Sequence, residues 1–117
     1  MPNRLCHFEI STRDMEKSKK FYTSVFDWKI EPDPNTNYTN IETGQEPTGG
    51  LFLAPPEMPL GITTYVLVDS IEETLEKVNN SGGRIVRPKQ EIPNIGWFAL
   101  FMDPEENVLG IFEALKK

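Results

Sequence analysis

One short stretch holds the residues best suited to chemistry. Leu5 to Ser11 read LCHFEIS and contain the only histidine of the chain, His7, with Glu9 two positions later. Residues two positions apart in a β-strand lie on the same face, so both side chains are expected to point the same way. An imidazole titrates near neutral pH, and imidazole and carboxylate are both common metal ligands. The stretch therefore predicts either an acid–base pair or half of a divalent metal site.

A simpler interpretation competes with both of these. A histidine beside a glutamate on a strand is often only a hydrogen-bonded pair that satisfies two half-buried polar groups. The elements around His7 and Glu9 decide which interpretation applies, because they determine what else shares that face.

The composition describes an ordinary globular protein. The chain has 117 residues, of which 38% are hydrophobic and 26% charged, enough to bury a core without disulfides or a structural metal. It has no apolar run of membrane-spanning length and no signal-like start, and its single cysteine fits a reducing compartment. We expect one cytoplasmic domain over 1–117. A formal charge of −6 with scattered basic residues argues against a nucleic-acid partner.

The first half of the chain predicts a strand, a helix and three strands. The alternating stretch from Leu5 to Ser11 is the first strand. Asp14 is placed to cap a helix that runs to about Phe26, and Asp27 follows where a helix often ends in a left-handed residue. Three further strands are expected at 28–31, 38–43 and 51–54.

The second half predicts the same order. A strand at 62–68 precedes a helix that Ser70 caps and that ends at residues 81–83. Strands follow at 84–87, 97–102 and 108–112, with a proline-containing loop from 88 to 94. A shift of 56 residues brings Asp14 onto Ser70. The pattern therefore indicates an α+β protein with two βαβββ modules, at about 1–56 and 60–115, whose curved mixed sheet surrounds a central groove.

Several segments, in this order, resemble the vicinal oxygen chelate superfamily of glyoxalases, bleomycin-resistance proteins and extradiol dioxygenases. They read HFEIS, FYTSVFDW, TGGLF and YVLVDSIEETLEKVNNSGGRIVRPKQEIPNIGWFALFMDPEENVLGIFE, and cover most of the chain. The closest likeness is to the small bacterial stand-alone glyoxalase-like branch, which implies the two modules and a homodimer. Asp27 and Glu106 stand where such proteins usually have glycine, so Glu106 implies either some backbone strain or a changed turn type.

The resemblance implies metal ligands on the first and last strands of each module. His7 matches the first of them. Thr63 stands at the second, residues 49–54 contain no carboxylate, and Gly110 occupies the position where glutamate is expected. We therefore expect no catalytic metal and no other cofactor.

One of the two carboxylates near these positions leaves an alternative open. Glu9 lies on the same predicted face as His7, so the pair could bind a divalent ion weakly. Glu113 has the opposite parity to Gly110 in the last strand and is expected to face away from the groove.

The groove is then expected to bind a small molecule. His7 and Glu9 would provide polar contacts and would act as an acid–base pair if the protein is an enzyme. Aromatic side chains and a gap in place of a ligand residue would complete the pocket. The predicted ligand-binding residues are Phe52, Thr63, Tyr65, Trp97 and Gly110.

Two functions remain open at this point. The first is a bleomycin-resistance-like protein that binds a small organic molecule without a catalytic metal. The alternative is a metal-dependent or histidine-assisted lyase, isomerase or dioxygenase of the same superfamily, and a purely structural module is a third possibility. The expected partners are a small-molecule ligand and a second copy of the chain, without nucleic acid or membrane.

Overall fold

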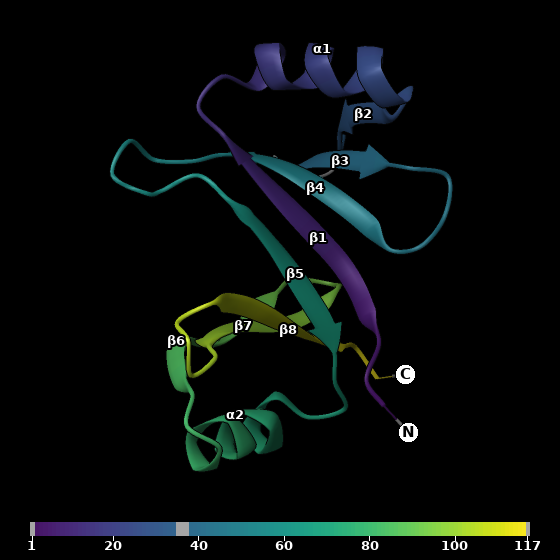
Figure 1. The fold of residues 1–117 in the computed structure, drawn as a ribbon. Coiled ribbons are helices and arrows are strands. Elements are labelled where there is room, and N and C mark those ends of the chain that lie inside the picture. The colour runs from purple at the N-terminus through teal and green to yellow at the C-terminus, as the bar shows by residue number, and fades with distance from the viewer. Residues whose placement is uncertain (1, 35–37, 117) are drawn as a thin grey trace. The chain divides into compact units, whose positions relative to one another are not determined.

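The computed structural model describes residues 2–34 and 38–116, and these form two helices and eight strands. The order strand, helix, three strands occurs twice, so the α+β class and the two predicted βαβββ modules are confirmed (Figure 1). Neither helix of the described ranges has the length and apolar character needed to span a membrane. The elements are β1 Leu5–Thr12, α1 Met15–Phe26, β2 Lys29–Pro32, β3 Thr39–Glu42, β4 Thr48–Leu53, β5 Ile62–Leu67, α2 Ile71–Asn80, β6 Arg84–Ile92, β7 Gly96–Met102 and β8 Val108–Ala114.

The chain divides into two compact units. The first unit is His7–Thr63, and the second consists of Met1–Cys6 and Thr64–Lys117. The start of the chain belongs to the second unit, and it hydrogen-bonds to β5. The side-chain amide of Asn3 donates to the Leu67 carbonyl, and the Leu67 backbone amide donates to the Arg4 carbonyl, both at 2.9 Å. The first unit ends in sequence at Thr63.

The first unit packs α1 against one face of a mixed sheet. Its strands lie in the order β2-β3-β4-β1, with β1 and β4 parallel and the other neighbours antiparallel. The core is made by alternate strand residues, onto which side chains of α1 and the following segment pack. These buried residues are Ile10, Ile30, Ile41 and Leu51, and the residues packed on them are Phe8, Met15, Tyr22 and Trp28.

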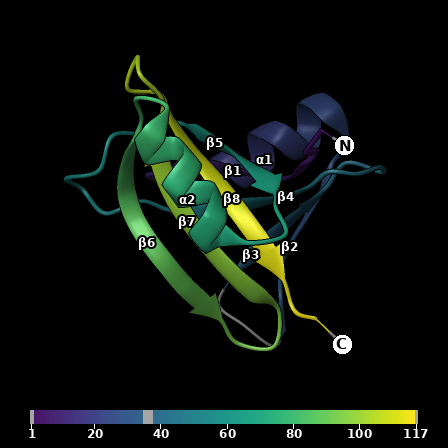
Figure 2. The same ribbon diagram turned by 90° about the horizontal axis from the view of Figure 1, so that it is seen from below.

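The second unit has the same arrangement. Its strands lie in the order β5-β8-β7-β6, with β5 and β8 parallel and the remaining pairs antiparallel. Figure 2 shows α2 lying across β7 and β8, with β6 along the outer side. The core beneath α2 contains Val68, Ile71, Leu75, Ala99 and Ile111.

Local chemistry explains the helix boundaries. The Asp14 carboxylate accepts a hydrogen bond from the Lys17 amide at 3.1 Å, and the Ser70 hydroxyl accepts one from the Glu73 amide at 3.2 Å, so both predicted caps are confirmed. Asp27 ends α1 in the left-handed region with φ 61°, as predicted. Glu106 also has a positive φ, 70°, so the turn keeps the backbone conformation of a glycine and, of the two predicted outcomes, the structure shows the strained residue.

Two strand predictions were wrong. Gly49 and Gly50 lie inside β4, although they were expected to precede it. Residues 88–92 continue β6, where a loop was predicted. Pro88 is tolerated there because β6 is the outer strand of its unit and its pairing with β7 shifts register between Arg87 and Gln90, so no ladder hydrogen bond needs the missing N–H.

Candidate functional site

The first unit places its polar residues on the sheet face opposite α1. Paired residues of neighbouring strands share a face. Ile10 pairs with Leu51 on the core side, so the alternate pairs, His7 with Thr48 and Glu9 with Gly50, lie on the other side. The prediction that His7 and Glu9 share a face away from the helix is therefore confirmed by the register.

Four side chains on this face form one hydrogen-bonded chain, which we call the Thr48–Glu9 chain. The Thr48 hydroxyl lies 2.9 Å from Nδ1 of His7, and the Tyr38 hydroxyl lies 2.8 Å from Nε2 of the same ring. The Tyr38 hydroxyl also donates to Oε2 of Glu9 at 2.9 Å. His7 and Glu9 are thus connected through Tyr38, and both ring nitrogens of His7 have a partner.

The electrostatics of this chain favour a neutral imidazole. Burial lowers the pKa of His7 below its ordinary value, because an apolar environment disfavours the imidazolium. The nearby Glu9 carboxylate acts in the opposite direction and raises the pKa, but the burial effect is larger. At neutral pH His7 is therefore uncharged, with one ring nitrogen that donates and one that accepts.

The Tyr38 hydroxyl comes within hydrogen-bond distance of His7 and Glu9 because the residue of β4 that it approaches is a glycine, Gly50. A Cβ atom on Gly50 would overlap the Tyr38 hydroxyl, so only glycine leaves room for this close approach. The backbone of Tyr38 is also held, since its carbonyl accepts a hydrogen bond from the Asp33 amide at 2.8 Å. On the opposite face, Gly49 gives the same close access to the ring of Phe8.

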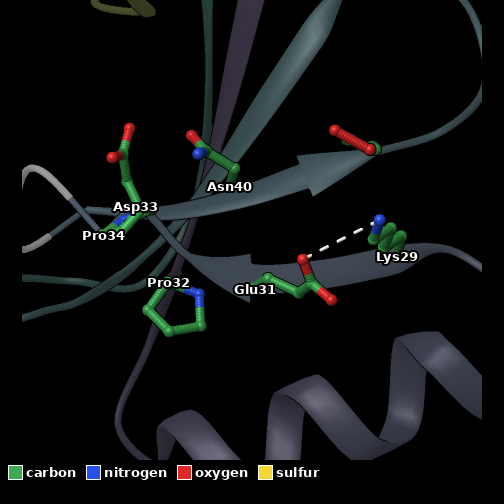
Figure 3. Close-up of a pocket in the computed structure, with 7 residues that line it drawn as sticks. Lys29, Glu31, Pro32, Asp33, Pro34 and Asn40 are labelled. Carbon is green, nitrogen blue, oxygen red and sulfur yellow. Dashed lines mark ion pairs between the residues drawn. The ribbon is translucent and has the colours of Figure 1, made fainter.

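A pocket of about 160 Å³ lies beside β2 and β3 (Figure 3). The register puts Glu31 with Asn40, and Asn40 with Gly50, so this part of β2 and β3 has the same polar face as the Thr48–Glu9 chain. Carboxylates outnumber cations in the lining, and the ion pair between Lys29 and Glu31 is 3.9 Å long and exposed. The lining residues are Lys29, Glu31, Pro32, Asp33, Pro34, Asn40 and Glu42.

Phe52 is the predicted aromatic residue that fits this face. It pairs with Ser11, two positions from Glu9, so its half-buried ring lies on the same side of the first sheet as His7. Thr63 lies in β5 at the end of the first unit. Within the first unit, Phe52 thus shares one sheet face with the His7 and Glu9 pair.

The open space expected at Gly110 is filled. Tyr65 pairs with Gly110 across β5 and β8, and a Cβ atom on this glycine would overlap the tyrosine ring. Tyr65 is only 8% exposed. Gly110 thus accommodates a buried aromatic side chain in the second unit, and the predicted gap does not exist.

Trp97, predicted as a ligand-binding residue of the groove, lies on the helix-facing side of its sheet. Trp97 pairs with Glu113, on the α2 side of the sheet, and packs on the core of the second unit with Lys89 4.8 Å from its ring. Glu113 accepts a hydrogen bond from the Ile71 amide at the start of α2, at 2.9 Å. Its predicted orientation away from Gly110 is therefore correct, and its carboxylate stabilises the N-terminus of the helix.

The described residues do not fit a catalytic divalent metal. Within 2–34 and 38–116 there is no group of three or more histidine, cysteine, aspartate or glutamate side chains that could hold an ion. His7 already uses both ring nitrogens, so an ion at either would displace Tyr38 or Thr48. Catalytic sites usually use about three protein ligands. We derive no reaction step through a metal.

Sequence reasoning missed Tyr38 and Thr48. They lie 31 and 41 residues from His7 in the sequence, and no short-range spacing connects them to it. One signal was present, because two successive glycines inside a strand often mark the close approach of another group. Gly50 is the position that Tyr38 approaches.

Comparison with known proteins gives a consistent assignment. Residues 4–44 match the family of bleomycin resistance protein-like N-terminal domains. The chain is 28% identical over 114 residues to a candidate glyoxylase from Mycobacterium bovis. The alignment covers 91% of this chain and 44% of that protein. It therefore spans less than half the length of this curated relative.

Solved structures share the fold at lower identity. A hypothetical protein from Bacillus halodurans C-125 superimposes with a TM-score of 0.72 and 19% identity, covering 100% of this chain and 98% of that one. Methylmalonyl-CoA epimerase from Mycobacterium tuberculosis superimposes with a TM-score of 0.69 and 11% identity, covering 96% and 88%. With the sequence relatives, these findings support the vicinal oxygen chelate superfamily for this chain, and the resemblance inferred from the sequence is confirmed.

Proposed function

We propose that this protein binds a small organic molecule on the polar face of its first unit, without a catalytic metal. The observation that carries the proposal is the Thr48–Glu9 chain, in which four side chains hold one another in fixed orientations. Binding sites for small molecules combine a few oriented polar groups with aromatic contacts. Phe52, on the same sheet face, provides the aromatic contact.

The superfamily supports this proposal at a general level. Relatives of the chain are described as glyoxylase-like and bleomycin-resistance-like. The fold is shared by proteins with different chemistry, so the site residues must carry the specific argument. Here they favour binding by hydrogen bonds, because His7 has both nitrogens engaged by neutral hydroxyl groups. The homodimer and the cytoplasmic location remain predictions.

The test is a calorimetric titration of the purified protein with a panel of small aromatic alcohols, amines and aldehydes. Tyr38→Phe should weaken any saturable binding by about tenfold, the loss expected for one or two hydrogen bonds. Tyr22→Phe is the matched control, because it removes a tyrosine hydroxyl from α1, on the opposite side of the same sheet. Equal affinities in the two variants, or no binding across the panel, would contradict the proposal.

A second candidate is a proton-transfer enzyme, which the neutral state of His7 favours. A neutral imidazole can take a proton from a carbon beside a carbonyl group. In this scheme the substrate C–H proton moves to Nδ1 of His7 after the Thr48 hydroxyl turns away. The electron pair of the broken C–H bond is held as the enolate of the carbonyl group, and the imidazolium donates through Nε2 to Tyr38 while the Glu9 carboxylate balances its charge. The proton then returns from Nδ1 to the same carbon, on either face.

Deuterium exchange tests this second candidate separately. The protein is incubated in heavy water with small 2-hydroxy ketones, 2-hydroxy aldehydes and acyl thioesters, and proton NMR follows the loss of the C–H signal. Exchange that is abolished in His7→Gln and kept in Tyr22→Phe would support it. Exchange at equal rates in wild type and His7→Gln would exclude His7 as the base, while the binding proposal would stand.

A further inference from the structure

We infer that Tyr38 is a positioning residue that fixes the order of donors and acceptors in the Thr48–Glu9 chain, which we call its direction. In every hydrogen bond of this chain the donor lies on the Thr48 side, and the chain thereby selects ligands that donate a hydrogen bond. This inference rests on the proposed function, because it names the class of ligand that the same face takes. It depends on the order of donors and acceptors along four side chains, each of which is placed by a distance of 2.8 or 2.9 Å.

The direction starts at Glu9. An ionised carboxylate only accepts hydrogen bonds, so the hydroxyl proton of Tyr38 must be used toward Oε2 of Glu9. A tyrosine hydroxyl has one proton. Its oxygen can therefore interact with His7 only as an acceptor, and Nε2 of His7 must carry the ring proton.

The direction then passes through the imidazole. A neutral ring with its proton on Nε2 has an accepting nitrogen at Nδ1. The Thr48 hydroxyl, 2.9 Å away, must donate its proton to that nitrogen. Since the threonine proton is used, the outer end of the chain has only lone pairs left on the Thr48 oxygen.

Thr48 is the exposed end of this chain, whereas His7, Glu9 and Tyr38 are half-buried. A ligand that meets Thr48 therefore meets an acceptor. The favoured chemical class is a hydroxyl, ammonium or amide N–H group, and an ether or carbonyl oxygen at the same place would face lone pairs. The preference comes from the negative charge of Glu9, transmitted through Tyr38 and His7.

Tyr38 can fix the direction because it is itself fixed. Gly50 lets its hydroxyl come close to the sheet, and the Asp33 amide holds its carbonyl. Preorganised groups of this kind lose little conformational entropy when a ligand binds. Phenylalanine at this position would keep the ring and remove both hydrogen bonds, so neither tautomer of His7 would be selected.

The experiment is a two-bond proton–nitrogen NMR spectrum of the uniformly ¹⁵N-labelled full chain without ligand. The chain has one histidine, so the imidazole signals need no assignment. We expect the pattern of a ring protonated at Nε2 in the wild type and in the control Tyr22→Phe, and an averaged pattern of both tautomers in Tyr38→Phe. A wild-type ring protonated at Nδ1, or a Tyr38→Phe spectrum identical to that of the wild type, would overturn the inference.

The ligand class is tested with matched pairs. For each compound that binds in the titrations, the hydroxyl form is compared with its methyl ether, and the hydroxyl should bind about tenfold more tightly in the wild type. In Tyr38→Phe this ratio should fall toward one. A ratio of one in the wild type would overturn the selectivity. If no compound binds, the proposed function fails, and the tautomer spectrum still decides the role of Tyr38.

Discussion

The two units have the same architecture but differ on the sheet face opposite their helix. In the first unit that face has the Thr48–Glu9 chain, whose members all offer polar groups. In the second unit the corresponding face has Tyr65 packed over Gly110, and the register adds Phe98, Leu100 and Phe112 to the same side. A repeat of the fold is thus not a repeat of the chemistry. One unit positions polar groups, and its counterpart packs an aromatic ring at the same place.

The largest effects should come from the helix-facing sides, where the units are alike. Leu51 is fully buried in the first unit and Ile111 is 1% exposed in the second. Replacing either by alanine should lower the free energy of unfolding by about 2–5 kcal/mol, because each change leaves a cavity in a closed core. Urea unfolding curves measure both losses.

A difference of more than about a factor of two between Leu51→Ala and Ile111→Ala would break this comparison, because the spread usual for such changes is of that order. It would mean that the two helices do not cover their sheets equally. The exposed Leu53→Ala is the matched control for Leu51→Ala, since it removes the same atoms from the same strand without opening a core.

A pair of glycine substitutions should separate the two opposite faces. Gly110→Ala pushes a methyl group into the ring of buried Tyr65 and should cost about 1–3 kcal/mol of stability. Gly50→Ala meets only the end of the Tyr38 side chain, which can turn away, so the loss should be about 1 kcal/mol. The NMR signals of His7 should change in Gly50→Ala alone.

This pair sharpens the comparison because stability responds to changes in either unit, whereas the histidine signals come from the first unit alone. Urea unfolding and the two-bond NMR spectrum are measured on both variants. If Gly110→Ala changed the His7 spectrum as much as Gly50→Ala does, the hydrogen bonds of the Thr48–Glu9 chain would depend on the second unit. If neither variant changed it, Tyr38 would not be seated over Gly50 as described.

Local features were predictable from the sequence, and these are the features that depend on neighbours in the chain. Asp14 and Ser70 cap their helices through amides three residues away, and the alternation of β1 puts His7 and Glu9 on one side. The prediction for Trp97 was wrong because the face on which it lies depends on its pairing with Glu113 in the neighbouring strand. The sequence of a single strand does not reveal that pairing.

The site was only half predictable for the same reason. Tyr38 and Thr48 come to His7 through the pairing of β1 with β4 and of β4 with β3, which is decided by the packing of the whole unit. The space at Gly110 was misjudged because the neighbouring strand carries Tyr65. Residue types suggest which groups can do chemistry, and long-range pairing decides which of them meet.

The smallest effect in this comparison is a pH dependence that belongs to the first unit alone. Burial lowers the pKa of His7 in the folded protein below the value of about 6.5 for an exposed histidine. As the pH falls through that value, the unfolded chain gains a proton that the folded protein does not bind, so the free energy of unfolding decreases. The decrease continues until the pH reaches the lowered pKa of folded His7, and above the exposed value His7 contributes no slope.

Urea unfolding across this pH range, compared between wild type and His7→Gln, isolates the contribution, because the other titrating groups are common to both. As the pH falls, the free energy of unfolding of the wild type should decrease more than that of His7→Gln. Tyr65→Phe, in the second unit, should keep the wild-type slope. The Glu9 carboxylate raises the pKa of His7, so Glu9→Gln should lower that pKa further. The free energy of unfolding of Glu9→Gln should therefore keep decreasing to a lower pH than that of the wild type. Parallel curves for wild type and His7→Gln would show that His7 titrates alike in the folded and unfolded chains, and the buried, neutral imidazole on which the Thr48–Glu9 chain depends would then be wrong.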